Sequence, residues 1–140
     1  MKTITLKQPW ASLIAHGYKK YEFRTWKTTY RGEILIHAGK GVDKKAMERV
    51  KKYNLDYPSS RIIAKVKIID CIPLNKEINN KLCEENRDVY GYNEHEGYAW
   101  VLSGPELLDI NEEINGRLSF WEYDIKKWYN WLRRNYYESS

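Results

Sequence analysis

The order of apolar and polar positions predicts a chain that mixes short strands with short helices. The most apolar stretch, residues 61–74 ("RIIAKVKIIDCIPL"), is rich in Ile and Val, which is typical of a strand in the middle of a sheet. Runs of β-branched, aromatic and alternating residues predict further strands at residues 3–6, 19–26, 31–39, 97–104 and 116–124. Residues 105–108 ("PELL") are predicted to begin a turn.

Apolar residues at helical spacing predict several helices. They lie at residues 8–17, 43–53 and 124–137, and residues 75–97 are predicted to hold a short helix followed by a loop. In the first helix, Pro9 suits the first helical position and Gly17 suits the end. In the second, Asp43 is the predicted N-cap.

These elements predict one domain of the α+β class that covers residues 1–140 and ends in a helix at about 124–137. A length of 140 residues suits a single hydrophobic core. No linker, repeat or low-complexity segment divides the chain. The strands are expected to form a curved sheet or a small barrel, with the short helices beside it.

Charge and aromatic content point to the kind of partner. Residues 1–65 hold fifteen Lys and Arg against five Asp and Glu, a net charge of +10, whereas residues 66–140 carry −5. The chain also has twelve Tyr and six Trp but only two Phe. A basic half attracts anions, and Tyr and Trp offer flat faces on which unpaired bases stack. Nucleic acid explains this bias, and a solvated lysine-rich surface explains it equally well.

Metal sites and membrane spans are not predicted. Cys71 and Cys83 form no C-x-x-C motif, and His16, His37 and His95 lack metal-ligand spacing, so no metal or other cofactor is expected. No apolar run approaches the length of a membrane span. Free thiols and the absence of a signal-like N-terminus predict a cytoplasmic protein.

The segment at residues 17–32 ("GYKKYEFRTWKTTYRG") alternates aromatic and charged residues. A pleated strand over residues 20–26 sends alternate side chains to opposite faces, one toward the core and one toward solvent or a groove. The second face carries Lys20, Glu22, Arg24 and Trp26. Glu22 and Arg24 are then either an exposed ion pair worth under about 1 kcal/mol or part of a binding site.

Four residues of this segment also fit a known motif. Gly17, Lys19, Glu22 and Arg24 match Gly-x-Lys-x-x-Glu-x-Arg without a gap. The accompanying blocks are "QPWA" at residues 8–11, "RGEILIHAGK" at 31–40, "YAWVLSGPELL" at 98–108 and "NGRLSFWEY" at 115–123. With these blocks in order, about residues 1–124 resemble the ASCH domain family, which belongs to the PUA-like superfamily of small β-barrels.

The resemblance implies a PUA-like β pseudobarrel, flanked by short helices, with a cleft that binds nucleic acid. RNA is favoured over DNA, and a modified base or nucleoside is an alternative ligand. The residues expected at the interface are Lys19, Arg24, Trp26, Lys27, Arg31, His37 and Lys40. Trp26 is the preferred stacking ring, because Trp10 lies on the apolar stripe of its helix. For His37, a strand-end residue bonded to the backbone is the competing interpretation.

A hydrolase is the alternative function. One bacterial branch that resembles this domain removes acyl groups from N4-acetylcytidine with a Lys, a Thr nucleophile and a Glu. Lys19 matches the Lys, but Glu22 occupies the position of the Thr, so Lys19 and Glu22 are the candidate catalytic pair. RNA cleavage assisted by Lys19, His37 and Lys40 is a second route. A third hypothesis is a protein-interaction domain that uses the C-terminal helix.

Overall fold

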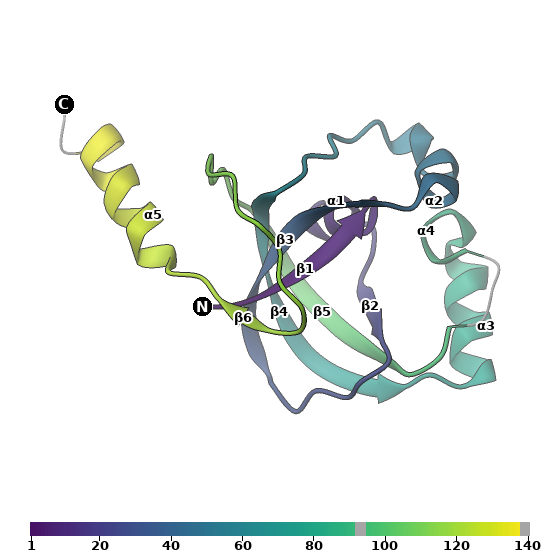
Figure 1. Cartoon of the computed structure of the whole chain (residues 1–140). Coiled ribbons are helices and arrows are strands. Elements are labelled where there is room, and N and C mark those ends of the chain that lie inside the picture. The colour runs from purple at the N-terminus through teal and green to yellow at the C-terminus, as the bar shows by residue number, and fades with distance from the viewer. Residues whose placement is uncertain (92–94, 138–140) are drawn as a thin grey trace.

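The centre of the molecule is a six-stranded sheet in the order β2-β5-β4-β3-β1-β6 (Figure 1). The computed structural model describes residues 1–91 and 95–137. The strands are β1 (Lys2–Gln8), β2 (Tyr21–Arg24), β3 (Gly32–Val42), β4 (Arg61–Pro73), β5 (Tyr98–Leu107) and β6 (Trp121–Glu122). β1 runs parallel to β3, and the other neighbouring strands are antiparallel. The predicted α+β class is confirmed.

Short helices accompany the sheet at its ends. They are α1 (Trp10–Ala15), α2 (Lys44–Arg49), α3 (Lys76–Glu85), α4 (Arg87–Tyr90) and α5 (Ile125–Leu132). A 3₁₀ turn (Lys51–Tyr53) comes after α2, and a π-helical segment (Arg133–Tyr137) continues α5. Figure 1 shows α2, α3 and α4 grouped at one end of the sheet, whereas α5 projects away from the other end.

The sheet curls until β1 and β2 approach each other, but these two strands do not pair. Instead the guanidinium of Arg24 on β2 donates a hydrogen bond to the carbonyl oxygen of Thr5 on β1 at 3.1 Å. β6 pairs only with Lys2 and Thr3, so β1 lacks a strand partner on this side from Thr5 onward. Within the described residues the expected pseudobarrel is therefore present with an open seam between β1 and β2.

Three apolar clusters stabilise this arrangement. The main core lies within the curve of the sheet and includes Ile4, Leu6, Ile14, Ile36 and Trp100. A second cluster, around Leu13, Val50 and Tyr90, lies under α2, α3 and α4. A third, around Leu35, Ile62, Trp121 and Ile125, joins the outer face of the sheet to the start of α5.

Most predicted strands are confirmed, and two predictions near the end of the chain are wrong. The run at residues 61–74 is β4, which lies between β3 and β5 as its apolar composition indicated. Residues 105–107 are not a turn, because β5 continues through Leu107 and pairs there with Ala64 of the long strand β4. Of the strand expected at residues 116–124, only Trp121 and Glu122 pair with β1.

The structure confirms one of the predicted helix signals and differs from two others. The side chain of Asp43 accepts a hydrogen bond from the backbone N–H of Ala46 at 3.0 Å and caps α2 as predicted. Pro9 precedes α1 by one residue instead of beginning it. Residues 75–91 contain two helices where one was expected, because Asn86 provides a second N-cap.

No helix within residues 1–91 and 95–137 is long and apolar enough to cross a membrane. Cys71 and Cys83 are both free thiols.

Candidate functional site

A pocket of about 440 Å³ opens at the seam between β1 and β2. β1 contributes Thr5, Leu6 and Lys7, and the capping residue Asp43 lies at its border. Three other groups complete it: the charged side chains Lys19, Glu22 and Arg24, the rings of Trp10, Phe23, Tyr90 and His95, and Val89. The pocket exists because β6 is too short to cover this part of β1.

Lys19 reaches the pocket from the turn that follows α1. Gly17 has a φ of +82°, a conformation that favours glycine, and it ends the helix. The backbone N–H groups of Tyr18 and Lys19 then both donate to the carbonyl oxygen of Leu13, which ties the turn to α1. From this position the Lys19 ammonium donates to the carbonyl oxygen of Tyr21.

Glu22 accepts hydrogen bonds from several donors at once. Its Oε1 atom lies 3.1 Å from the Lys19 Nζ atom and also accepts from the backbone N–H of Phe23 at 3.1 Å. Its Oε2 atom lies 3.5 Å from an Arg24 nitrogen. The side chains of Lys19 and Glu22 are only 3% and 10% exposed. Of the two alternatives, an exposed Glu22–Arg24 ion pair is therefore wrong, because Lys19 folds back from its turn onto Glu22 and the three side chains form a network with Lys19 and Glu22 buried.

Arg24 has hydrogen-bond donors that its ion pair with Glu22 does not use. Its side chain is about one quarter exposed, lines the pocket and bonds to Thr5 across the seam. Its Nε atom is buried and has no hydrogen-bond partner among the described residues.

Burial perturbs three titratable groups of the pocket, Lys19, His95 and Tyr90, and it raises the pKa of Tyr90 to about 12. It lowers the pKa of Lys19 below the ordinary value of 10.5, and the nearby Glu22 carboxylate opposes only part of this shift. It also lowers the pKa of His95, and the positive charge of Lys19 adds to that effect. His95 donates from Nε2 to the carbonyl oxygen of Tyr90 at 2.8 Å. Its ring lies against Phe23 with centroids 4.2 Å apart.

Several residues predicted for the interface lie away from this pocket. Lys27 and Arg31 are exposed on the connection between β2 and β3, where Arg31 lies 3.6 Å from Asp70. Trp26 packs edge-on against Trp100, with ring centroids 4.7 Å apart, and against Phe120. Its ring packs against the main core and does not line the pocket.

His37 and Lys40 lie on β3, outside the pocket as well. His37 is fully buried, and its two ring nitrogens bond to the hydroxyl of Thr5 and the carbonyl oxygen of Ile114. The bond to the backbone carbonyl of Ile114 agrees with the competing interpretation, but His37 lies in the middle of β3 and not at its end. Lys40 is exposed and lines a second cleft. Of the cations expected to contact phosphate, only Lys19 and Arg24 meet in the first pocket.

The structure adds residues to the pocket that the sequence did not single out. Lys7 follows Thr5 by two positions on β1, so both point to the same face of the strand. Trp10 was assigned to the core from its helix stripe, yet its half-buried ring lines the pocket. His95 lies in a segment expected to be a solvated loop, and Asn79 of α3 holds its backbone at the pocket through two hydrogen bonds. Glu94 of that segment lies outside the described residues.

Within residues 1–91 and 95–137, no cluster of His, Cys, Asp or Glu suits a metal ion.

Comparisons with known proteins agree with the motif and the fold. The family description "ASCH domain" matches residues 4–131. "Activating signal cointegrator 1" from mouse and from human are each 27% identical over 135 residues, which cover 88% of this chain. The chain spans only 22% of the length of these relatives.

A solved structure supports the same conclusion about the fold. The crystal structure of ASCH from Zymomonas mobilis superposes with a TM-score of 0.56 and 14% identity, over 94% of this chain and 92% of that one. The architecture is thus that of ASCH and PUA-like domains. From the match over residues 4–131, the chain belongs to the ASCH domain family.

Proposed function

We propose that the seam pocket binds a nucleobase exposed from single-stranded nucleic acid, with RNA favoured over DNA. The observation that carries the proposal is the Lys19–Glu22–Arg24 network, which is buried in a pocket lined by aromatic rings. A volume of about 440 Å³ falls in the range of small-molecule sites, and a single nucleoside fits such a space. RNA is favoured because proteins recognise it mainly through unpaired bases.

Each group of the pocket has a role in this proposal. The ring of Trp10 offers a face for stacking, worth roughly 1–3 kcal/mol per base. The Glu22 carboxylate accepts from an exocyclic amino group, as carboxylates do from cytosine N4. Arg24 donates to a base carbonyl or a phosphate oxygen, and Lys7 supplies a further cation at the mouth of the pocket.

The test measures binding of a fluorescein-labelled single-stranded RNA of twelve nucleotides by fluorescence anisotropy. Replacing Arg24 by Gln is expected to weaken binding about tenfold or more, because one charge-assisted contact is lost. Lys7→Gln is expected to weaken binding more modestly while leaving the fold intact, since Lys7 is exposed. Lys76→Gln, at the exposed start of α3, is the matched control and should bind as wild type does.

Thermal unfolding of each variant shows whether a loss of binding is a loss of fold. The proposal is abandoned if wild type at about 50 mM salt, where phosphate contacts are strong, does not bind the RNA. It is also abandoned if Arg24→Gln and Lys7→Gln, both folded, bind as well as Lys76→Gln.

One observation favours a second function, hydrolysis of an N4-acylated cytidine. Lys19 is a buried amine with a lowered pKa, and it lies 3.1 Å from the Glu22 carboxylate. In this reaction Glu22 takes a proton from water as the hydroxide adds to the acyl carbon. Lys19 stabilises the resulting oxyanion, and the C–N4 bond then breaks to give a carboxylic acid and cytidine, whose amine takes up the proton.

Chromatography of N4-acetylcytidine and of RNA after incubation with the protein decides between binding and turnover. Hydrolysis predicts that wild type forms cytidine and acetate and that Lys19→Ala forms neither. Shortened RNA fragments would indicate the ribonuclease form of the hypothesis. Unchanged substrates with wild type, beside measurable RNA binding, would leave binding as the only function.

A further inference from the structure

A second cleft, of about 430 Å³, lies next to the seam pocket and shares Thr5 with it. We call it the glycine cleft, because Gly39 and Gly116 form part of its wall. Its other lining residues are Lys40, Ser60, Asn115, Arg117 and Leu118. Thr5 is common to both cavities, so the two are adjacent along β1.

The glycines allow the chain to pack closely beside the shared residue. A Cβ atom on Gly116 would come within 2.7 Å of the Thr5 side chain, and one on Gly39 within 2.9 Å. The segment before β6 therefore lies directly on β1 and β3. The Thr5 hydroxyl oxygen holds it there by accepting from the backbone N–H of Arg117 and from the indole of Trp121.

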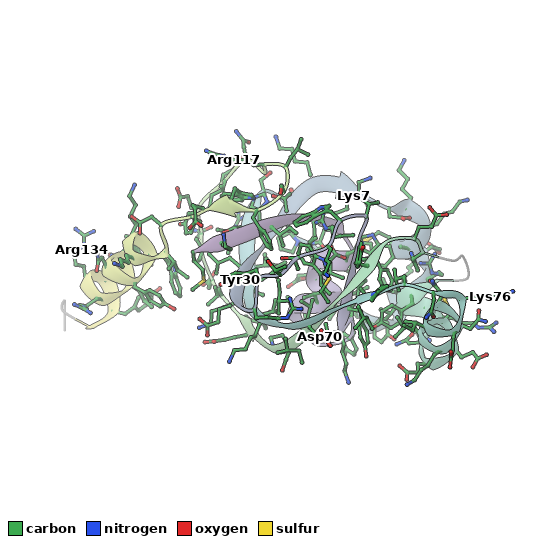
Figure 2. All side chains as sticks on the ribbon, turned by 90° about the horizontal axis from the view of Figure 1, so that it is seen from below. Lys7, Tyr30, Asp70, Lys76, Arg117 and Arg134 are labelled. Atoms are coloured by element: carbon green, nitrogen blue, oxygen red, sulfur yellow. The ribbon has the colours of Figure 1, made fainter. Side chains whose placement is uncertain are left out.

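Three cations follow this part of the surface. The aliphatic stem of Lys7 lies across Gly41 of β3, where an added Cβ would meet it at 3.0 Å. Lys40 precedes Gly41 in the chain and lines the glycine cleft. Arg117 lies over the ring of Trp121 at 5.8 Å, and Figure 2 shows it on the same side of the molecule as Lys7.

Lys7, Lys40 and Arg117 differ from Lys19 and Arg24 in their ion pairing. Lys19 and Arg24 both face Glu22. Within residues 1–91 and 95–137, Lys7, Lys40 and Arg117 form no ion pair. The lining of the glycine cleft includes no carboxylate, and Ser60 and Asn115 add uncharged polar groups that suit an anion with several oxygens.

We propose that the glycine cleft binds the phosphodiester backbone of the nucleotides next to the base held in the seam pocket. This inference rests on the proposed function and extends it from one base to a strand of several nucleotides. Lys40 and Arg117 contact phosphate, and Lys7 bridges the two cavities.

The experiment compares a ligand that fills only the seam pocket with one that spans both cavities. Cytidine binding is followed by NMR at the indole N–H of Trp10, and binding of fluorescein-labelled oligocytidylate of eight nucleotides by anisotropy. In the double variant Lys40→Gln/Arg117→Gln, affinity for the octamer is expected to fall at least tenfold. The slope of log affinity against log salt concentration should decrease by about 1.4, or roughly 0.7 per lost phosphate contact. The cytidine-induced shifts at Trp10 should stay as in wild type.

The matched control is Lys76→Gln/Arg134→Gln, which removes the same charge from opposite ends of the molecule (Figure 2). This control should keep the octamer affinity of wild type. If both double variants bind the octamer equally well, the glycine cleft is not a subsite, while the proposed function stands. If the glycine-cleft variant loses cytidine as well, its effect arises in the seam pocket and the inference fails. If wild type binds no octamer, the inference falls, and the absence of RNA binding removes the proposed function too.

Discussion

At the scale of single residues, the chemistry of the pocket depends on one carboxylate that faces two cations. Glu22 lies between the ammonium of Lys19 and the guanidinium of Arg24, and it also accepts from the backbone of β2. A buried ion pair contributes little net stability compared with apolar residues, but removing one partner leaves a buried charge uncompensated. The network is therefore sensitive to the loss of Glu22.

Glu22→Gln is expected to destabilise the fold by about 3 kcal/mol at pH 7, because it leaves the buried Lys19 amine without its counter-charge. Urea denaturation measures this difference. Glu33→Gln is the matched control, since Glu33 pairs with Lys65 at 3.6 Å on the surface and is about half exposed. It should cost under about 1 kcal/mol.

The pH dependence of the destabilisation by Glu22→Gln identifies the group that causes it. The pKa of Lys19 is lowered in the folded protein, so the unfolded chain binds more protons between that pKa and 10.5. Stability therefore rises with pH over this interval as the buried amine becomes neutral. Without Glu22 the lowering is larger, so the deficit of Glu22→Gln should shrink as the pH rises toward 10.5. A deficit that stays constant would show that Lys19 is not the destabilised group.

At the scale of elements, the lengths of strands and the caps of helices decide where the pocket opens. β6 has two residues and β2 has four, which leaves the seam between β1 and β2 uncovered by strand pairing. On the opposite wall, α3 presents Asn79 to the backbone of His95. The position of His95 thus depends on the first turns of α3.

Asn75→Ala is expected to destabilise the protein by about 1 kcal/mol, because the Asn75 side chain accepts from the backbone N–H of Ile78 at 2.8 Å and caps α3. Asn80→Ala, at an exposed position within the same helix, is the control and should be neutral or slightly stabilising through helix propensity. Both values come from chemical denaturation. Equal effects of the two substitutions would mean that the cap does not stabilise α3.

At the scale of the whole molecule, the curled sheet gathers segments that are far apart in the chain. The seam pocket combines β1, the turn after α1, β2, α4 and His95. The glycine cleft combines β1 and β3 with the segment before β6, where the hydroxyl of Thr5 meets the backbone of Arg117 across 112 positions of sequence. Both cavities border the same stretch of β1, which is why they are proposed to serve one ligand.

Local patterns were enough to predict most of the elements and the centre of the site. The apolar run at 61–74 indicated a central strand, Asp43 indicated a helix start, and the motif spacing placed Glu22 and Arg24 on one face of a strand. These features depend on neighbours a few residues away, so short windows of sequence carry the information.

Short windows of sequence did not predict which side chains line the pocket. The sequence favoured Trp26 over Trp10 for the binding site, yet Trp26 packs against Trp100 and Phe120, and Trp10 lines the cavity. His37 is on a strand beside glycines, but long-range hydrogen bonds to Thr5 and Ile114 bury it. The choice between core and cavity follows from packing between distant segments, which no short window contains.

The sequence by itself determined the family, the α+β class and the central strand, because motif spacing and periodicity are local properties of the chain. The motif also marked Lys19, Glu22 and Arg24 as candidate site residues, and the tertiary structure brought them together in one cluster. Only the tertiary structure decided that Lys7, Trp10 and His95 join this cluster. It also decided that Lys27 and Arg31 line neither cavity and that Lys40 lines the adjacent glycine cleft. The physical reason is that the curl of the sheet and the shortness of β6 set which side chains face the open seam, and both arise from contacts between residues far apart in sequence.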